Sequence, residues 1–148
     1  MSAPASTAAV PDSVFAQTYL PLPTPDDANL ARWGRVLALR DTVNKAIEAR
    51  RAAGELGASL QAAITLTLPA DDWALCQAMG PDLKYLFIVS RVTLQAGNEV
   101  AVQVDLAPGT KCERCWHYTD DVGQHGHEGV CGRCVSNLHG DGESRGVA

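Results

Sequence analysis

Four cysteines in the C-terminal third of the chain have the spacing of a metal site. They form two Cys-x-x-Cys pairs, Cys112 with Cys115 and Cys131 with Cys134, and fifteen residues separate the pairs. A Cys-x-x-Cys loop directs two sulfurs toward one point, and two such loops can complete a tetrahedron around Zn²⁺. Four protein ligands leave no open coordination position, so the predicted zinc is structural rather than catalytic.

Other chemistry is open to the same cysteines, namely two disulfides, a redox-active dithiol or an iron–sulfur cluster. The chain has five cysteines, an odd number, and its first twenty residues contain neither Lys nor Arg. A secretory leader has a basic start, so these features favour a reducing, cytoplasmic compartment and therefore zinc over disulfides. No apolar run has the length of a membrane span, so we expect no membrane partner.

The residues next to the cysteines allow two interpretations. Lys111, Arg114 and Arg133 would offset the charge of −2 on a zinc ion held by four thiolates. Trp116 either packs over the metal loops as a miniature core or stays exposed beside Arg114 as a stacking platform for an unpaired base. The nearby histidines are predicted to be solvated loop residues because four sulfurs already fill the metal shell; they are His117, His125, His127 and His139.

Charge limits the possible partners. The formal net charge is −5, whereas a free-standing nucleic-acid binder is usually basic. Any nucleic-acid contact must therefore be local or shared with a larger surface. Arg50 and Arg51, at the end of a basic predicted helix, are either phosphate contacts or part of a solvated face. Cys76, on an apolar helix, is predicted to be a small buried side chain rather than a nucleophile.

The remaining elements predict an α+β fold. Residues 1–25 hold five of the eight prolines and are predicted to be an extended or disordered lead-in. A long helix over 26–57 is expected, with Thr24 as its cap, Pro25 at the first helical position and Gly54 and Gly57 at its end. Its apolar positions follow a helical period: Leu30, Trp33, Leu37, Val43 and Ile47.

Residues 58–108 predict a small three-stranded sheet with one short helix. The first strand alternates through Ile64 to Leu68, and the third alternates from Val100 to Leu106. The second is expected to begin in the apolar run Tyr85–Val89 and to continue through Val92 and Leu94. A helix over Asp72–Met79, capped by Asp71 or Asp72, joins the first two strands. Residues 109–148 are rich in glycine and are predicted to be a loop-built zinc-knuckle module that needs its metal to hold a shape.

Several segments match a known family. Those near the C-terminus are KCERCWHY (111–118), VG (122–123), CGRCVSNL (131–138) and GDGE (140–143). They resemble the C-terminal zinc module of bacterial-type isoleucyl-tRNA synthetases. The segments upstream are DSVF (12–15), VNKAIEAR (43–50), GASLQA (57–62) and LFIVS (86–90). These resemble the family's lead-in, the end of its anticodon-binding helical domain and the α/β junction that follows. The resemblance covers residues 12–148.

This resemblance implies a domain order and a function. Residues 26–57 would be the helical tail of the anticodon-binding domain, 58–108 the α/β junction and 109–148 the zinc-finger module. The family attaches isoleucine to tRNA using ATP. The HIGH and KMSKS motifs are absent here, so this chain resembles a C-terminal piece that should be inactive alone. ATP and isoleucine would serve only the parent enzyme. Expected partners are the anticodon side of tRNA and the rest of the synthetase polypeptide. Contact is expected at Arg114, Trp116 and Arg133, and more weakly at Arg50 and Arg51.

Two other functions remain open at this point. Formamidopyrimidine-DNA glycosylases carry a related four-Cys finger, but their catalytic N-terminal proline has no counterpart here, since residue 2 is Ser. The second alternative function is a stand-alone zinc module for protein–protein contact, which the acidic net charge favours slightly.

Overall fold

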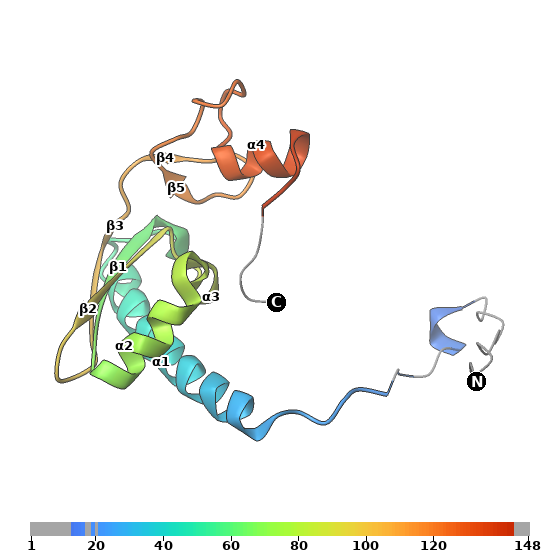
Figure 1. Cartoon of the computed structure of the whole chain (residues 1–148). Helices are drawn as coiled ribbons and strands as arrows, with labels where there is room; N and C mark the ends of the chain where they lie inside the picture. The colour runs from blue at the N-terminus through green and yellow to red at the C-terminus, as the bar shows by residue number, and fades with distance from the viewer. Residues whose placement is uncertain (1–12, 17–18, 20, 144–148) are drawn as a thin grey trace.

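A small sheet with helices on one face lies beside a C-terminal module that contains the four clustered cysteines (Figure 1). This computed structural model describes residues 13–16, 19 and 21–143. The predicted α+β class, with a long N-terminal helix, a three-stranded sheet and a four-Cys module, is confirmed. Much of the predicted lead-in, residues 1–12, 17–18 and 20, falls outside the described residues.

Helix α1 (Asp27–Ala52) begins after a short 3-10 helix (Val14–Ala16) and an exposed stretch without regular structure over residues 21–26. Its cap is Asp26, whose carboxylate accepts a hydrogen bond from the Ala28 N–H at 3.1 Å. The prediction of Thr24 as the cap was wrong by two residues. A carboxylate interacts well with the positive end of the helix dipole, and Asp26 has the extended backbone that an N-cap requires. Gly54, at φ +75°, follows the helix as predicted.

One stripe of α1 packs on the sheet, formed by Val36, Leu39, Val43 and Ile47. The predicted stripe was right for Val43 and Ile47 but wrong for Leu30 and Leu37, which are 55% and 49% exposed. Trp33 is half-buried at the edge of the core. The helix carries more apolar residues than one stripe can hold, and contact with the sheet decides which of them are buried.

The central strand of the sheet is β1 (Ala62–Leu68). It pairs in parallel with β2 (Arg91–Ala96) and antiparallel with β3 (Ala101–Leu106). Ile64 lies opposite Val92 and Val104, and Leu66 lies opposite Leu94 and Val102, so the apolar side chains of all three strands share one face. The predicted alternation is therefore confirmed for β1 and for Val102 and Val104 of β3, whereas Val100 lies before β3 and Leu106 is 66% exposed.

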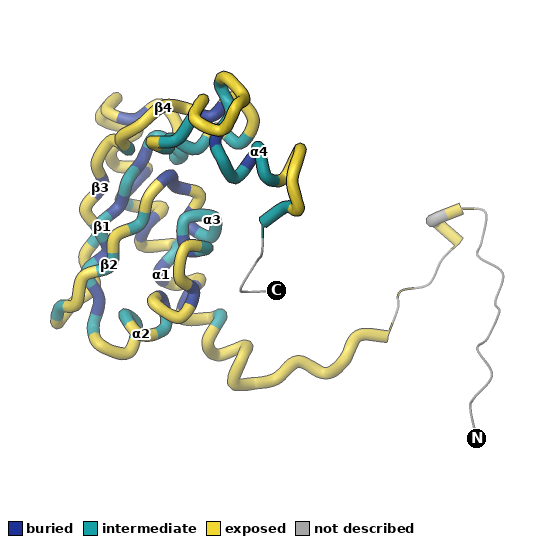
Figure 2. The backbone as a smooth tube through the Cα atoms, turned by 45° about the horizontal axis from the view of Figure 1, so that its top comes forward, coloured by how far each residue is buried: buried dark blue, intermediate teal, exposed yellow. Residues whose placement is uncertain are grey.

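Burial alternates along β1, where the tube in Figure 2 changes between dark blue and teal, because successive residues face opposite sides of the sheet. The apolar face packs on α1 and α2 and contributes Ile64, Leu66 and Leu68, each at most 1% exposed. The opposite face is polar, with Thr93, Gln95 and Gln103 among its exposed residues. An antiparallel or mixed sheet with one solvated face shows this alternation of apolar and polar residues.

The connection from β1 to β2 contains α2 (Ala70–Met79), a 3-10 helix (Gly80–Asp82) and α3 (Leu83–Phe87). The helix predicted over Asp72–Met79 is confirmed but begins two residues earlier, at Ala70. The prediction of Asp71 or Asp72 as its cap was wrong, because Pro69 occupies the N-cap position and both aspartates lie in the first turn.

The prediction that the second strand starts at Tyr85 was wrong, because residues up to Phe87 are helical. Leu83 and Phe87 lie four residues apart, and both are buried on one side of a helical turn. Ile88, at φ 55°, then ends the helix, and β2 begins at Arg91.

The C-terminal module contains regular structure that the sequence analysis missed. Strands β4 (Thr110–Lys111) and β5 (Tyr118–Thr119) form an antiparallel pair, and α4 spans Gly132–His139. The expectation of a module built only from loops was therefore wrong. Along the described part of the chain, no helix combines the length and apolarity required to cross a bilayer.

The core should respond strongly to truncation at Leu66, which is fully buried in the central strand. We expect Leu66→Ala to lower the free energy of unfolding by about 2–5 kcal/mol, because the cavity adds to the lost burial. Urea unfolding measures this change. The matched control is Gln95→Thr on the exposed face, which should change stability by less than about 0.5 kcal/mol. Equal effects of the two substitutions would contradict the assignment of the faces.

Candidate metal centre

The four sulfurs of Cys112, Cys115, Cys131 and Cys134 converge on one point. They all lie within 4.8 Å of one another, and all five cysteines of the chain are free. The Cys115 and Cys131 sulfurs are 3.8 Å apart. A tetrahedral zinc with bonds of about 2.3 Å separates its sulfurs by roughly 3.8 Å, whereas a disulfide brings them to about 2.05 Å. The geometry fits a tetrathiolate metal site and contradicts the disulfide alternative.

Each cysteine pair is held by a different element. Cys112 and Cys115 lie in the turn between β4 and β5, where the Cys112 N–H donates to the His117 carbonyl and the Trp116 N–H donates to the Cys112 carbonyl, both at 2.9 Å. Cys131 occupies the N-cap position of α4, and Cys134 lies in its first turn. The Cys131 N–H also donates to the Cys112 sulfur at 3.4 Å. Backbone N–H groups at a helix start favour a thiolate there.

The surroundings of three of the sulfurs shift their pKa values in opposite directions. Burial raises the pKa of the Cys131 thiol to about 12, and it also raises the pKa of Cys115. At Cys112 burial opposes ionisation, but backbone N–H groups of Cys115, Cys131 and Arg114 outweigh it and lower the pKa to about 6. Four thiolates packed this closely repel one another unless a soft divalent ion replaces the protons. The Arg114 guanidinium, 3.6 Å from the Cys134 sulfur, adds positive charge as predicted.

A close backbone approach joins the two cysteine loops at Gly129. The Glu113 N–H donates to the Gly129 carbonyl at 2.9 Å, and Gly129 has φ +73°. A Cβ atom at this position would lie 2.7 Å from the Glu113 carboxylate. The positive φ favours glycine here, whereas the Glu113 carboxylate is the end of a flexible side chain and could move aside for a larger residue.

Trp116 is exposed rather than packed as a miniature core. Its side chain is 59% exposed, and its indole N–H donates to the Glu113 carbonyl at 3.2 Å. Its backbone is left-handed, at φ 65°. The Lys111 ammonium lies 5.2 Å from the centre of the ring. The buried cysteines of the module pack instead against Cys115, Val122 and Val130.

The arginines predicted to contact RNA lie on two different parts of the structure. Arg133 pairs with Glu143 and is only 27% exposed. Arg50 pairs with Glu55 at 2.6 Å and Arg51 with Glu48 at 2.7 Å, both on the surface of α1 or just after it. The structure therefore gathers Arg114, Trp116 and Arg133 in the cysteine module and leaves Arg50 and Arg51 on another element. Their contact with RNA stays a prediction.

Comparison with known proteins supports this metal site. Residues 109–137 match the family model described as a zinc finger found in FPG and IleRS. The chain is 44% identical over 140 residues to the isoleucine–tRNA ligase of Bordetella avium, which covers 92% of this chain and 15% of that protein. It is 45% identical over 137 residues to the isoleucine–tRNA ligase of Thiobacillus denitrificans, and this match covers 90% of the present chain and 15% of that protein. It is 46% identical over 119 residues to the isoleucine–tRNA ligase of Chromobacterium violaceum, a match that covers 80% of the present chain and 13% of that protein.

The resemblance to the C-terminal region of isoleucyl-tRNA synthetases is confirmed. The chain spans about 15% of the length of the curated relatives it matches. The matched zinc finger contains all four clustered cysteines, and we call residues 109–143 the zinc-finger module from here on.

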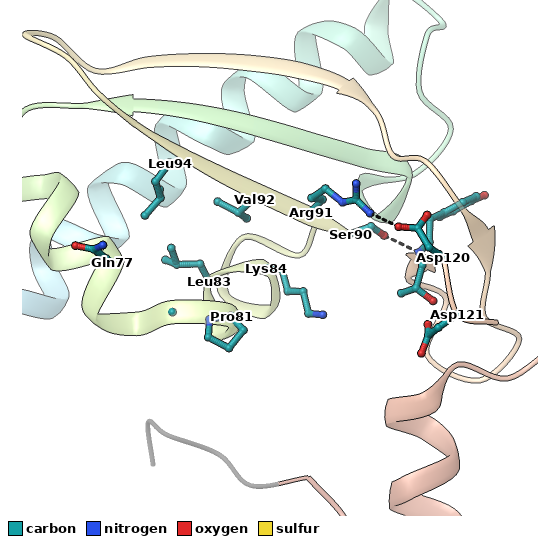
Figure 3. A pocket seen from close by; sticks show the side chains of 13 residues that line it. Gln77, Pro81, Leu83, Lys84, Ser90, Arg91, Val92, Leu94, Asp120 and Asp121 are labelled. Carbon is teal, nitrogen blue, oxygen red and sulfur yellow. Dashed lines mark hydrogen bonds and ion pairs between the residues drawn. The ribbon is translucent and has the colours of Figure 1, made fainter. Parts of the chain in front are cut away.

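The zinc-finger module is attached to the sheet through Ser90, a residue to which the sequence analysis gave no role. Ser90 is 7% exposed, and its hydroxyl donates to the Leu60 carbonyl at 2.5 Å and accepts from the Tyr118 N–H at 2.8 Å. Beside it, Arg91 pairs with Asp120 at 2.7 Å (Figure 3). A polar residue directly after the buried Val89 was the available signal.

A cavity of about 640 Å³ opens next to this attachment, between β2, the α2–α3 connection and β5 (Figure 3). Leu83, Val92 and Leu94 form its apolar part. Its described carboxylates are already engaged, since Asp120 pairs with Arg91 and Asp121 accepts from the Gly132 N–H.

The four histidines near the cysteines lie outside the metal cluster, and so does Cys76. His117 is half-buried, with its Nδ1 3.2 Å from the Cys115 carbonyl, so the expectation that it is solvated was wrong. His127 and His139 are exposed and stack with ring centres 4.2 Å apart. Cys76 is buried as predicted, and burial, followed by the charge of Asp72, raises its pKa to about 11.

Removing one sulfur should abolish metal binding. We expect Cys131→Ser to reduce zinc from one ion per chain to a small fraction and to unfold the zinc-finger module, because the module has little other core. Mass spectrometry under native conditions measures the metal content. The matched control, Cys76→Ala, removes a buried thiol outside the cluster and should retain the ion. Loss of zinc in both variants, or in neither, would contradict the assignment.

Ser90→Ala should weaken the attachment of the module. The substitution leaves the Leu60 carbonyl and the Tyr118 N–H without their shared partner, which should cost about 1–3 kcal/mol. We expect faster amide hydrogen exchange at Tyr118 with zinc still bound. Ser59→Ala, at a half-buried serine outside this contact, is the control. Unchanged exchange at Tyr118 would show that Ser90 does not hold the module.

Proposed function

We propose that this chain is the zinc-containing, tRNA-binding portion of an isoleucine–tRNA ligase and that it acts on the anticodon side of the tRNA. The observation that carries the proposal is an exposed Trp116 fixed beside the four-sulfur cluster. The relatives over nine-tenths of the chain are isoleucine–tRNA ligases, which supports the same conclusion.

The proposed site works by holding an aromatic surface in a fixed orientation. Cys112, Cys115, Cys131 and Cys134 would hold one zinc ion, which when bound supplies a crosslink between the two loops. Trp116 follows the second ligand directly, so its ring position depends on the loop geometry. Its open face can stack on an unpaired base. Such stacking discriminates little between bases, because every base has an aromatic face.

Positive groups around Trp116 would contact the RNA backbone. Lys111 lies against the ring, and Arg114 lies beside Cys134. Phosphate contacts of this kind set the position of a strand, while base contacts provide specificity. Arg50, Arg51 and Arg133 are proposed as further contacts, but ion pairs already engage each of them. An RNA phosphate would have to compete with those carboxylates.

The rest of the ligase is the second proposed partner. Activation of isoleucine with ATP would belong to the whole enzyme, most of whose length lies outside the matched region. Leu30, Trp33 and Leu37 have helical spacing on α1, and two of them are about half-exposed. We propose that this stripe packs against further helices of the ligase. The proposed units are residues 26–57, 58–108 and 109–148 after the lead-in 1–25, and the proposed compartment is the cytoplasm.

A DNA-contacting finger is the alternative, because the matched family model also includes FPG proteins. The two proposals differ in substrate shape. A stacking tryptophan suits an unpaired base, whereas a duplex contact would rely on the phosphate backbone and be strongly dependent on salt. The net charge of −5 opposes any binding mode that relies on phosphate contacts alone.

Trp116→Ala should weaken binding of a single-stranded loop. Loss of one stacked base is worth about 1–3 kcal/mol, so we expect roughly 5- to 150-fold weaker binding of an isoleucine-tRNA anticodon stem-loop. Fluorescence anisotropy on the zinc-loaded chain measures the change. Trp116→Phe should retain much of the affinity, and Trp73→Phe on α2 controls for a general tryptophan effect.

The competitor in the same assay is a DNA duplex of equal length. Unchanged stem-loop affinity in Trp116→Ala, with one zinc retained, would contradict the stacking role. Tighter binding of the duplex than of the stem-loop would favour the DNA alternative.

A further inference from the structure

Both cysteine loops contact the ring of Tyr85, which lies outside the zinc-finger module on α3. The His117 ring meets it edge to face, with centres 5.3 Å apart and planes at 72°. The Arg133 guanidinium carbon lies 4.6 Å from the ring centre. Edge-to-face aromatic pairs and guanidinium–aromatic pairs are both attractive.

The orientation of Arg133 is fixed by Glu143. Two parallel hydrogen bonds join them, from Nε at 2.5 Å and from Nη2 at 2.7 Å, and the Glu143 N–H donates to Asn137 Oδ1 at 3.0 Å. Such a bidentate pair holds the plane of the guanidinium. The hydrogen bond to Glu143 raises the pKa of Arg133, so the group stays charged at any ordinary pH. It presents a fixed, planar cation to Tyr85.

The two contacts depend on the sulfur cluster for their spacing. Arg133 lies between Cys131 and Cys134, and His117 lies two residues after Cys115. One contact therefore comes from each cysteine loop. The two contacts are therefore tied to the geometry of the two cysteine loops, whose sulfurs lie within 4.8 Å of one another.

Tyr85 also supplies an attachment separate from the one at Ser90. Ser90 and Arg91 hold residues 118 and 120, which belong to β5 and its end. Through Arg133, Tyr85 reaches α4 instead. A module held at β5 alone could pivot about that strand, whereas a second attachment on α4 fixes its orientation.

We propose that Tyr85 is a positioning residue that fixes the orientation of the zinc-finger module, and thereby of Trp116, relative to the sheet. This role of Arg133 through Tyr85 is in addition to the RNA contact proposed above. The effect on RNA binding rests on the function proposed above; the effect on orientation does not. Loss of the ring would leave the metal bound but allow the module to reorient, and ordering it again would reduce affinity.

Residual dipolar couplings on the zinc-loaded full chain test the orientation directly. In the unsubstituted chain, residues 27–106 and 109–139 should share one alignment tensor. Tyr85→Leu should retain one zinc, and the two parts should then require different tensors. Tyr85→Phe keeps the ring face and should restore the shared tensor. Tyr19→Leu, at a fully exposed tyrosine, is the matched control.

A second variant tests the same contact from the other side, in case Tyr85→Leu does not fold. Arg133→Gln removes the cation from the surface of the module and should separate the tensors in the same way. A shared tensor in Tyr85→Leu or Arg133→Gln, with zinc bound, would overturn the proposal.

Stem-loop affinity measured on the same samples separates this inference from the proposed function. We expect roughly threefold to tenfold weaker binding in Tyr85→Leu, the size of a guanidinium–aromatic contact. If Trp116→Ala weakens binding and Tyr85→Leu does not, the positioning role for RNA fails and the proposed function stands. If the unsubstituted chain binds no RNA, the proposed function fails, and the tensors still decide the role of Tyr85.

Discussion

The convergence of four sulfurs on one point is the constraint on which the C-terminal part of this chain depends. Among its described residues, up to residue 143, the buried cluster consists of Cys112, Cys131 and Cys134, against which two half-buried valines and Cys115 pack. So little apolar surface cannot offset the entropy lost on ordering more than thirty residues. Ligand-to-metal bonds can do so, because the free energy of binding the ion becomes free energy of folding. The hairpin β4–β5 and helix α4 then form around the ligands.

The sheet has a core of its own, in which β1 is buried between α1, α2 and the neighbouring strands. The chain therefore joins two parts that are stabilised differently, one by apolar packing and one by metal ligation. Ser90 and Tyr85 lie where the two parts meet. Through them a rigid sheet can give a metal-held loop a defined direction. An exposed indole binds a base more tightly when the orientation of its ring is already fixed, because ordering a mobile group on binding reduces affinity.

Sequence patterns predicted the features that local chemistry determines. The Cys-x-x-Cys spacing requires one shared ion, and strict alternation in β1 and β3 requires one buried face, so both followed from the residues alone. The choice between strand and helix at Tyr85–Phe87 did not, because a short apolar run fits either. Packing of Leu83 and Phe87 against the core decides it. On α1, contact with the sheet selected Val36 and Leu39 over Leu30 and Leu37. The roles of Ser90 and Tyr85 depend on contacts across 28 or more residues of sequence, which no local pattern contains.

Metal analysis of the freshly purified, reduced chain tests the central claim most directly. Zinc should be present at one ion per chain, and replacement by Co²⁺ should give the visible bands of a tetrahedral ion together with strong sulfur-to-cobalt charge transfer. Chelation should remove these signals and the amide protection of residues 109–139 while leaving the sheet folded. A chain that holds no stoichiometric metal, or a module whose protection survives chelation, would contradict the account.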